Sequence, residues 1–185
     1  RPMLDIDGAA VVPPPGAFVQ AVGEAERLMA EAVLQATPKA KHIADLFTGI
    51  GTFTLRLARR ARVLAIDSDR RAITALEAAA RQAQGLKPIE VRVRDLFRDP
   101  LSPRELDVFD AVVFDPPYAG AKVQAEALAR AKVPIVAAVS CNPATLARDL
   151  RILVDGGYRI ERIVPIDQFL YSAHVETVAI LRRGR

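Results

Sequence analysis

The sequence predicts an α/β fold in which seven strands form one mostly parallel sheet with helices on both faces. Apolar runs of strand length alternate with amphipathic stretches of helical period along most of the 185 residues. The strand runs are apolar throughout, which is typical of parallel strands buried on both faces. The last two strand runs have no helix between them, so the last strand should pair antiparallel.

The expected elements follow one another from residue 16 onward. A first helix is expected over 16–36, because apolar residues recur there at helical spacing until Pro38 ends it. The expected strands are 42–47, 62–67, 89–95, 109–115, 134–140, 158–167 and 174–183. The expected helices between them are 52–60, 70–84, 121–131 and 142–155.

Length and composition indicate one globular domain. The chain starts at Arg1 and residues 1–15 are proline-rich, so 1–15 is expected to be the tail of a preceding domain or a linker, and 16–185 the folded domain. Hydrophobic residues make up 51% and charged residues 26%, and no apolar run reaches the length of a bilayer span. We therefore expect a cytoplasmic monomer that does not associate with membranes.

Charge and metal-ligand residues give weaker indications. A net charge of +4 and a pI near 9.6 are compatible with a nucleic-acid partner, but the arginines are spread along the chain. One cysteine and two histidines form no cluster with metal-ligand spacing, so no metal is expected.

A glycine-rich turn after the first strand predicts a cofactor-binding cradle. Asp45 and Phe47 stand at the end of this strand, and Gly49 and Gly51 form a G-x-G turn before the next helix. In a doubly wound sheet such a turn lets a ligand approach the backbone at the carboxyl ends of the strands. No third glycine follows at dinucleotide spacing, which disfavours a pyrophosphate cofactor.

Acidic residues end the next two strands. Asp67 is placed to accept hydrogen bonds from ribose hydroxyls, and Asp95 to meet an adenine amino group. Each of them could instead only cap the segment that follows it. Together with Asp45 they resemble the S-adenosylmethionine site of class I methyltransferases. This resemblance implies the Rossmann-like fold of that class and S-adenosyl-L-methionine as the cofactor.

Cys141, the only cysteine, ends an apolar strand run and is followed by Asn142-Pro143, which should start a helix. A lone cysteine is usually an inert core residue, but this position brings the thiol to the mouth of a loop. A thiolate adds readily to the electrophilic carbon 6 of a uracil ring. Cys141 is therefore the candidate nucleophile.

Two acidic residues could complete a site with this thiol. Asp115 opens the tetrapeptide Asp-Pro-Pro-Tyr at 115–118, which taken alone resembles methyltransferases acting on exocyclic amino groups of bases. Glu176 lies in the otherwise apolar last strand, where it is either a base or a salt-bridged residue. His174 beside it is expected to be structural. Uracil chemistry needs a thiolate and a base on opposite sides of one ring, which Cys141 and Glu176 can supply.

Four segments together resemble the catalytic domain of the RNA uracil-5-methyltransferases, the family that makes 5-methyluridine in ribosomal and transfer RNA. The resemblance covers nearly the whole chain from about Pro13, and the cysteine loop is its most distinctive part. The segments are DLFTGIGTF at 45–53, DPP-x-AGA at 115–121, SCNPATLARDL at 140–150 and HVE at 174–176.

The resemblance implies a role for each candidate residue. Cys141 would add to carbon 6 of uracil, carbon 5 would then take the methyl group, and Glu176 would remove the carbon-5 proton. Asp115 would orient the polar edge of the base and border the cofactor, and Gln20, in an F-x-Q motif, would lie near both. The implied partner is RNA, with 23S ribosomal RNA preferred over transfer RNA because the ATLARDL segment is closer to that branch.

Three departures from the family pattern bear on the RNA target. Tyr118 stands where the family usually has an arginine, Val22 stands where an asparagine is frequent, and the segment before His174 lacks an expected proline. None of them removes the nucleophile or the base.

Three other functions fit parts of the sequence. An exocyclic-amine methyltransferase acting on RNA or DNA would use 115–118 but would leave Cys141 without a role. A cytosine-5 RNA methyltransferase is disfavoured because that family resembles a two-cysteine arrangement. A non-catalytic module that binds S-adenosylmethionine or RNA is the third, and family members commonly carry an N-terminal RNA-binding barrel that this sequence lacks.

Overall fold

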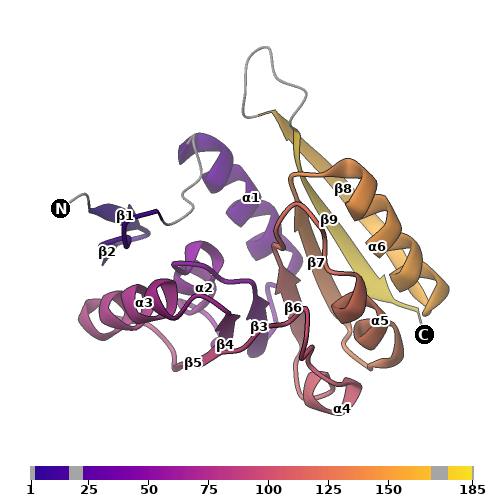
Figure 1. Ribbon diagram of the computed structural model, residues 1–185, viewed down its shortest axis with the longest axis horizontal. Coiled ribbons are helices and arrows are strands. Elements are labelled where there is room, and N and C mark those ends of the chain that lie inside the picture. The colour runs from indigo at the N-terminus through magenta and orange to yellow at the C-terminus, as the bar shows by residue number, and fades with distance from the viewer. Residues whose placement is uncertain (1–2, 17–22, 168–174, 185) are drawn as a thin grey trace.

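The computed structural model describes residues 3–16, 23–167 and 175–184, and its centre is a seven-stranded sheet with helices on both faces (Figure 1). The strand order is β5-β4-β3-β6-β7-β9-β8. The strands are β3 (His42–Leu46), β4 (Arg62–Asp67), β5 (Ile89–Val93), β6 (Ala111–Phe114), β7 (Ile135–Ser140), β8 (Tyr158–Asp167) and β9 (Val175–Arg183). All seven expected strands are confirmed, with ends shifted by a few residues.

Strand pairing agrees with the expected topology. The first five of these strands pair in parallel, whereas β9 pairs antiparallel with both β7 and β8. The chain crosses from β3 to β4 on one side and later returns to place β6 on the other side of β3. This reversal is the topological switch point, where ligands bind in open α/β sheets.

The helices form two layers on the sheet. Buried residues of α1 (Gly23–Ala36), α2 (Thr52–Leu57) and α3 (Arg70–Gln82) share apolar clusters with one face. Those of α4 (Pro103–Leu106), α5 (Lys122–Arg130) and α6 (Pro143–Asp155) share a cluster with the other. The expected helices are thus confirmed with some ends shifted by one to three residues, except at the start of the first one, where Gly16 lies in a turn and residues 17–22 lie outside the described residues. Within the described ranges, no helix has the length and apolarity that a bilayer crossing requires.

Local sequence explains where the helices α3 and α6 begin. The Asp69 side chain caps α3 by accepting from the backbone amides of Arg71 and Ala72. The Asn142 side chain caps α6 in the same way, and Pro143 occupies its first turn, where a missing N–H costs nothing. Both helices therefore start directly after a strand, at the edge where the site lies.

The sequence did not predict three short elements. Strands β1 (Leu4–Ile6) and β2 (Ala9–Val11) form an antiparallel hairpin within the segment expected to be a tail or linker, and α4 lies between β5 and β6. Ile6 and Val11 are buried in a cluster with Leu55 of α2 and Leu76 of α3. The hairpin therefore packs on the same core as these two helices (Figure 1).

Candidate functional site

Four polar side chains converge because strand alternation directs them to one face of the sheet. Side chains two residues apart on a strand share a face. One apolar cluster on the α1 face includes Ile43, Val113, Val139 and Val178. Along the same four strands or directly after them, the position two residues closer to the carboxyl edge of the parallel strands is polar in each case. These polar residues are Asp45, Asp115, Cys141 and Glu176.

Cys141 and Glu176 face each other across neighbouring strands. The last pair of the antiparallel β7–β9 ladder joins Ser140 to Thr177, and Cys141 and Glu176 come one residue further along. Directly opposed residues of an antiparallel pair have Cβ atoms about 5 Å apart. Cys141 is half-buried and Glu176 is buried, so a thiol and a carboxyl meet beneath one opening.

A pocket of about 510 Å³ opens above these side chains. It extends from the turn after β3 across the ends of β6, β7 and β9. Among its described lining residues are four carboxyl groups and no lysine, arginine or histidine. The lining contains Gly16, Phe47, Thr48, Gly49, Ile50, Thr52, Phe53, Asp67, Ser68, Asp69, Ala72, Phe97, Asp115, Pro116, Pro117, Tyr118, Cys141 and Glu176.

Most of the residues that the sequence predicted for the site line this pocket. Six of them do so: Phe47, Gly49, Asp67, Asp115, Cys141 and Glu176. Three more, Asp45, Gly51 and Asp95, lie within two residues of a lining residue in the chain but do not line the pocket themselves. Gln20 lies outside the described residues, as do His174 and Val22.

The turn after β3 is built from left-handed backbone. Phe47, Gly49 and Gly51 have φ of +60°, +55° and +96°. A side chain at Gly51 would place its Cβ 2.4 Å from Leu76 Cδ1, whereas a Cβ at Gly49 would meet no atom within 4 Å. Gly51 thus allows α2 and α3 to pack closely, and Gly49 leaves open space on the pocket side.

Asp45 lies buried beneath this turn. Its Oδ2 accepts hydrogen bonds from the hydroxyls of Thr48 at 2.9 Å and Thr54 at 2.6 Å, and its buried Oδ1 has no hydrogen-bond partner among the described residues. Burial raises the pKa of Asp45 to about 6, although the two threonine hydrogen bonds oppose the shift. Asp45 therefore braces the turn from below rather than facing the pocket.

Asp67 and Asp95 bond to their own loops. Asp67 Oδ2 accepts from the amide of Gly49 and Oδ1 accepts from the amide of Asp69, both at 2.9 Å. Asp95 Oδ1 accepts from the amide of Phe97 at 3.0 Å. Asp67 thereby joins the end of β4 to the glycine turn while lining the pocket. Its predicted ribose contact and the predicted adenine contact of Asp95 remain predictions.

Phe97 is a lining residue that the sequence analysis missed. Its ring is 44% exposed and lies 5.4 Å from the ring of Phe47, centroid to centroid. Two aromatic rings from different loops thus flank one end of the pocket. The available signal was an aromatic residue two positions after the acidic end of a strand, which is too common to single out a site.

Two groups on the β6–β7 side of the pocket, Asp115 and Cys141, have raised pKa values. Burial, together with the neighbouring Glu176 and Asp45 carboxylates, raises the pKa of Asp115 to about 8. Burial also raises the pKa of the Cys141 thiol, with Glu176 and then Asp115 adding to the effect. Asp115 is therefore protonated at neutral pH, and the resting thiol is protonated as well.

The cysteine loop holds the 115–121 loop by side-chain hydrogen bonds. Asn142 Nδ2 and Thr145 Oγ1 donate to the carbonyl of Tyr118 at 3.0 and 3.3 Å. Arg148 donates to the carbonyl of Ala119, and buried Asp149 accepts from the amide of Ala121 at 2.7 Å. The first two turns of α6 thus fix the loop that carries Asp115.

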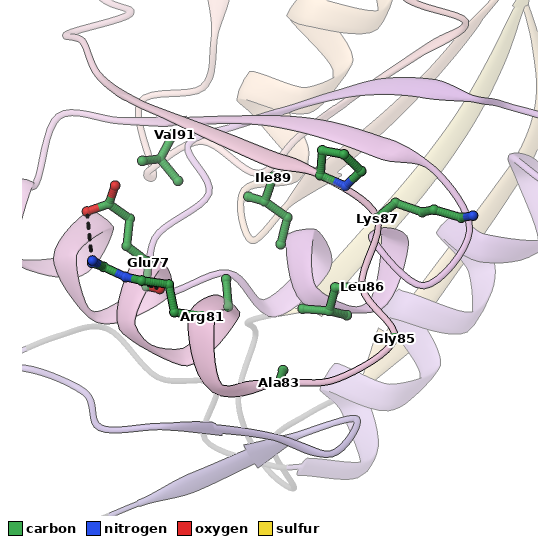
Figure 2. Close-up of a pocket in the computed structure, with 10 residues that line it drawn as sticks. Glu77, Arg81, Ala83, Gly85, Leu86, Lys87, Ile89 and Val91 are labelled. Atoms are coloured by element: carbon green, nitrogen blue, oxygen red, sulfur yellow. Dashed lines mark hydrogen bonds and ion pairs between the residues drawn. The ribbon is translucent and has the colours of Figure 1, made fainter.

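A second pocket, of about 430 Å³, lies away from this site between the end of α3 and β5 (Figure 2). Figure 2 shows Glu77 and Arg81 paired on the α3 side, with their charged atoms 3.8 Å apart. Leu86 and Ile89 line the opposite wall. It holds none of the candidate catalytic groups, so we do not assign chemistry to it.

The sheet order and the pocket at its switch point define the Rossmann-like fold of class I methyltransferases. The model of the tRNA (uracil-5-)-methyltransferase family matches residues 13–184, and the chain belongs to this family.

Similar proteins and solved structures include several RNA methyltransferases. An uncharacterized RNA methyltransferase of Rhizobium meliloti is 61% identical over 99% of this chain and 44% of that protein. The 23S rRNA (uracil(1939)-C(5))-methyltransferase RlmD of Alteromonas naphthalenivorans is 35% identical over 96% of this chain and 38% of that protein. The Pyrococcus abyssi tRNA (uracil-54, C5)-methyltransferase, solved with S-adenosyl-L-homocysteine, aligns with a TM-score of 0.79 and 32% identity over 97% of this chain and 43% of that chain. The chain therefore spans less than half the length of these relatives.

Proposed function

We propose that the chain transfers a methyl group from S-adenosylmethionine to carbon 5 of a uridine in RNA. The observation that carries this proposal is the placement of Cys141 opposite Glu176 at the floor of the pocket that the glycine turn also borders. A nucleophilic thiol and a general base are the two groups that methylation at this carbon requires. An amine-directed reaction would need no thiol.

The pocket suits the proposed methyl donor. Gly49 leaves open space beside the turn, and Phe47 and Phe97 offer apolar surfaces for an aromatic base. Asp67 and Asp69 add carboxyl groups without a basic residue among the described lining, which favours a ligand that carries positive charge. S-adenosylmethionine carries a sulfonium and an ammonium group, and when bound it supplies the methyl group.

Cys141 starts the reaction by bonding to carbon 6 of the uracil ring. Its sulfur adds as the thiolate, and the electron pair of the ring double bond moves toward carbon 5 and the adjacent carbonyl. Since the pKa of the resting thiol is raised, the proton must leave before or during addition. Positive charge brought into the pocket by the methyl donor would lower this pKa.

Asp115 and Glu176 act on the resulting adduct. Asp115, protonated because its pKa is about 8, donates a hydrogen bond to a uracil carbonyl oxygen as negative charge develops there. After carbon 5 is methylated, Glu176 accepts the carbon-5 proton. The electron pair of that C–H bond restores the ring double bond, and the sulfur of Cys141 leaves.

We propose ribosomal RNA as the substrate, and 23S rRNA in particular. The Alteromonas relative whose name specifies 23S rRNA supports this choice. The Pyrococcus structure, named for transfer RNA, makes transfer RNA the substrate to test beside it.

The test is the intact mass of the chain after incubation with S-adenosylmethionine and 23S rRNA transcripts that contain 5-fluorouridine. Glu176 can remove a proton but not fluorine, so a stable protein–RNA adduct is expected. The Cys141→Ala variant should form none. Transfer of radiolabelled methyl groups to base amines, without an adduct, would contradict the proposal and favour an amine methyltransferase. Parallel transfer RNA transcripts decide between the two substrates.

A further inference from the structure

Tyr118 is a solvent-facing aromatic residue at the mouth of the candidate site. Its side chain lines the pocket, yet the residue is 64% exposed. Among the described residues, its ring takes part in none of the ring–ring or cation–π contacts that the structure contains. A large aromatic ring that is mostly exposed at a pocket mouth is available to a ligand.

The backbone beneath this ring is fixed. Pro116 and Pro117 restrict the chain before it, and the Tyr118 carbonyl accepts hydrogen bonds from Asn142 and Thr145. Gly120 closes the loop with φ +76°, where a Cβ would lie 2.6 Å from Arg148 and 2.8 Å from Asp149. The ring thus has only its two side-chain torsions free, so ordering it against a ligand costs little entropy.

The same hydrogen bonds hold the backbone of Tyr118 close to the loop that carries the nucleophile. Asn142, which binds the Tyr118 carbonyl, directly follows Cys141. A uracil that reaches Cys141 and buried Glu176 would occupy the inner part of the pocket, whereas Tyr118, a lining residue of the same pocket, is largely exposed to solvent. The nucleotide next to an extruded uridine would therefore pass over this ring.

We propose that Tyr118 is a stacking platform for the base that flanks the target uridine, on single-stranded or extruded RNA. This proposal rests on the proposed function and adds a base-binding subsite to it. Stacking of bases on aromatic side chains accepts every base and is a common source of affinity for unpaired RNA. The Arg148 guanidinium, which donates to the carbonyl of the next residue, Ala119, adds positive charge to the same loop.

The test measures binding of RNA heptamers with a central 5-fluorouridine and 2-aminopurine on its 5′ or 3′ side. In the wild-type chain, fluorescence of the stacked 2-aminopurine should be quenched on binding. Tyr118→Ala should abolish the quenching and weaken the affinity about tenfold or more, while Tyr118→Phe should bind within about twofold of wild type. Val108→Ala, which removes an exposed apolar side chain outside the pocket lining, is the matched control.

A heptamer with an abasic flanking site completes a double-mutant cycle. Removing the stacked base should weaken binding by the wild-type chain but add nothing to the loss in Tyr118→Ala. Equal affinity of wild type and Tyr118→Ala, an equal abasic penalty in both, or no heptamer binding by the wild type would overturn the proposal. Adduct formation by mass is read in the same samples. Stacking without an adduct would refute the proposed chemistry alone, and an adduct without stacking would refute the platform alone.

Discussion

The two sides of the pocket satisfy their polar groups in opposite ways. On the β3–β4 side, Asp67 accepts backbone amides on both of its carboxylate oxygens. On the β6–β7–β9 side, Asp115 and Cys141 lie beside Glu176, and burial together with the charge of Glu176 raises the pKa of both groups. One side is a braced binding surface, and the other concentrates groups that gain or lose protons.

At this edge of the sheet, the groups that stabilise the fold are therefore different from the groups that could take part in a reaction. Hydrogen bonds to the backbone fix the shape of the β3–β4 side before any ligand arrives. Clustered carboxyl groups are unfavourable in the free protein, and such clusters are typical of catalytic sites. Substitutions on the β3–β4 side should therefore affect folding or ligand affinity. Substitutions on the β6–β7–β9 side should affect turnover and its pH dependence.

The largest expected effect tests the chemical side directly. Glu176→Gln removes the proposed base while keeping the size of the side chain, so turnover on uridine-containing RNA should fall by about 10² to 10⁴-fold. The adduct with ordinary uridine should then accumulate, because the carbon-5 proton stays in place. Intact-protein mass and methyl-transfer rates measure both effects. Normal turnover in the variant would assign the base elsewhere, and adding Cys141→Ala should remove the accumulated adduct.

Asp115 should make the free protein less stable as pH rises. The unfolded carboxyl ionises near its ordinary pKa of 3.8, whereas the folded one stays protonated up to about pH 8. The folded state therefore binds more protons across this window, and the free energy of unfolding falls by about 5 kcal/mol between pH 4 and 8. Chemical denaturation of wild type and Asp115→Asn across this range measures it.

The Asp115→Asn variant should lose most of this slope, while Asp45, with a pKa of about 6, leaves a smaller fall at the acidic end. Identical slopes in the two proteins would show that Asp115 ionises normally.

On the binding side, the two glycines should separate folding from ligand affinity. Gly51→Ala puts a Cβ 2.4 Å from Leu76 Cδ1 at φ +96° and should lower the free energy of unfolding by about 2 kcal/mol. Gly49→Ala adds its methyl to open space and should cost about 1 kcal/mol, but it should weaken binding of S-adenosylmethionine. Denaturation and calorimetric titration distinguish them. Equal effects on both measurements would contradict the separation.

The smallest expected effect concerns the thiol itself. The pH midpoint for alkylation of Cys141 by iodoacetamide should lie above the ordinary thiol pKa, because burial and the neighbouring carboxyls disfavour the thiolate. Glu176→Gln should lower this midpoint, because it removes a negative charge that disfavours the thiolate. Glu161→Gln, an exposed carboxyl on β8, is the control and should leave it unchanged. As the only cysteine, Cys141 gives a single mass shift to follow.

Local patterns were enough to predict the seven strands, the glycine turn and the nucleophile loop. Each depends on neighbours in sequence: apolar runs, glycines at a strand end, and Asn142 with Pro143 after Cys141. The hairpin 4–11 was missed because its two strands are three residues long and are stabilised by packing on Leu55 and Leu76 rather than by a strong pattern.

The sequence by itself determined which residues are candidates for chemistry, and the tertiary structure decided which of these candidates meet. Cys141 and Glu176 are distant in the chain and become neighbours only because β9 inserts antiparallel between β7 and β8 in one register. A slip of one residue would turn Glu176 to the other face. Tertiary structure also creates the hydrogen bond from Asn142 to the Tyr118 carbonyl and the ring contact between Phe97 and Phe47. Periodicity reports local burial, whereas register and loop contacts are set by packing of the whole sheet.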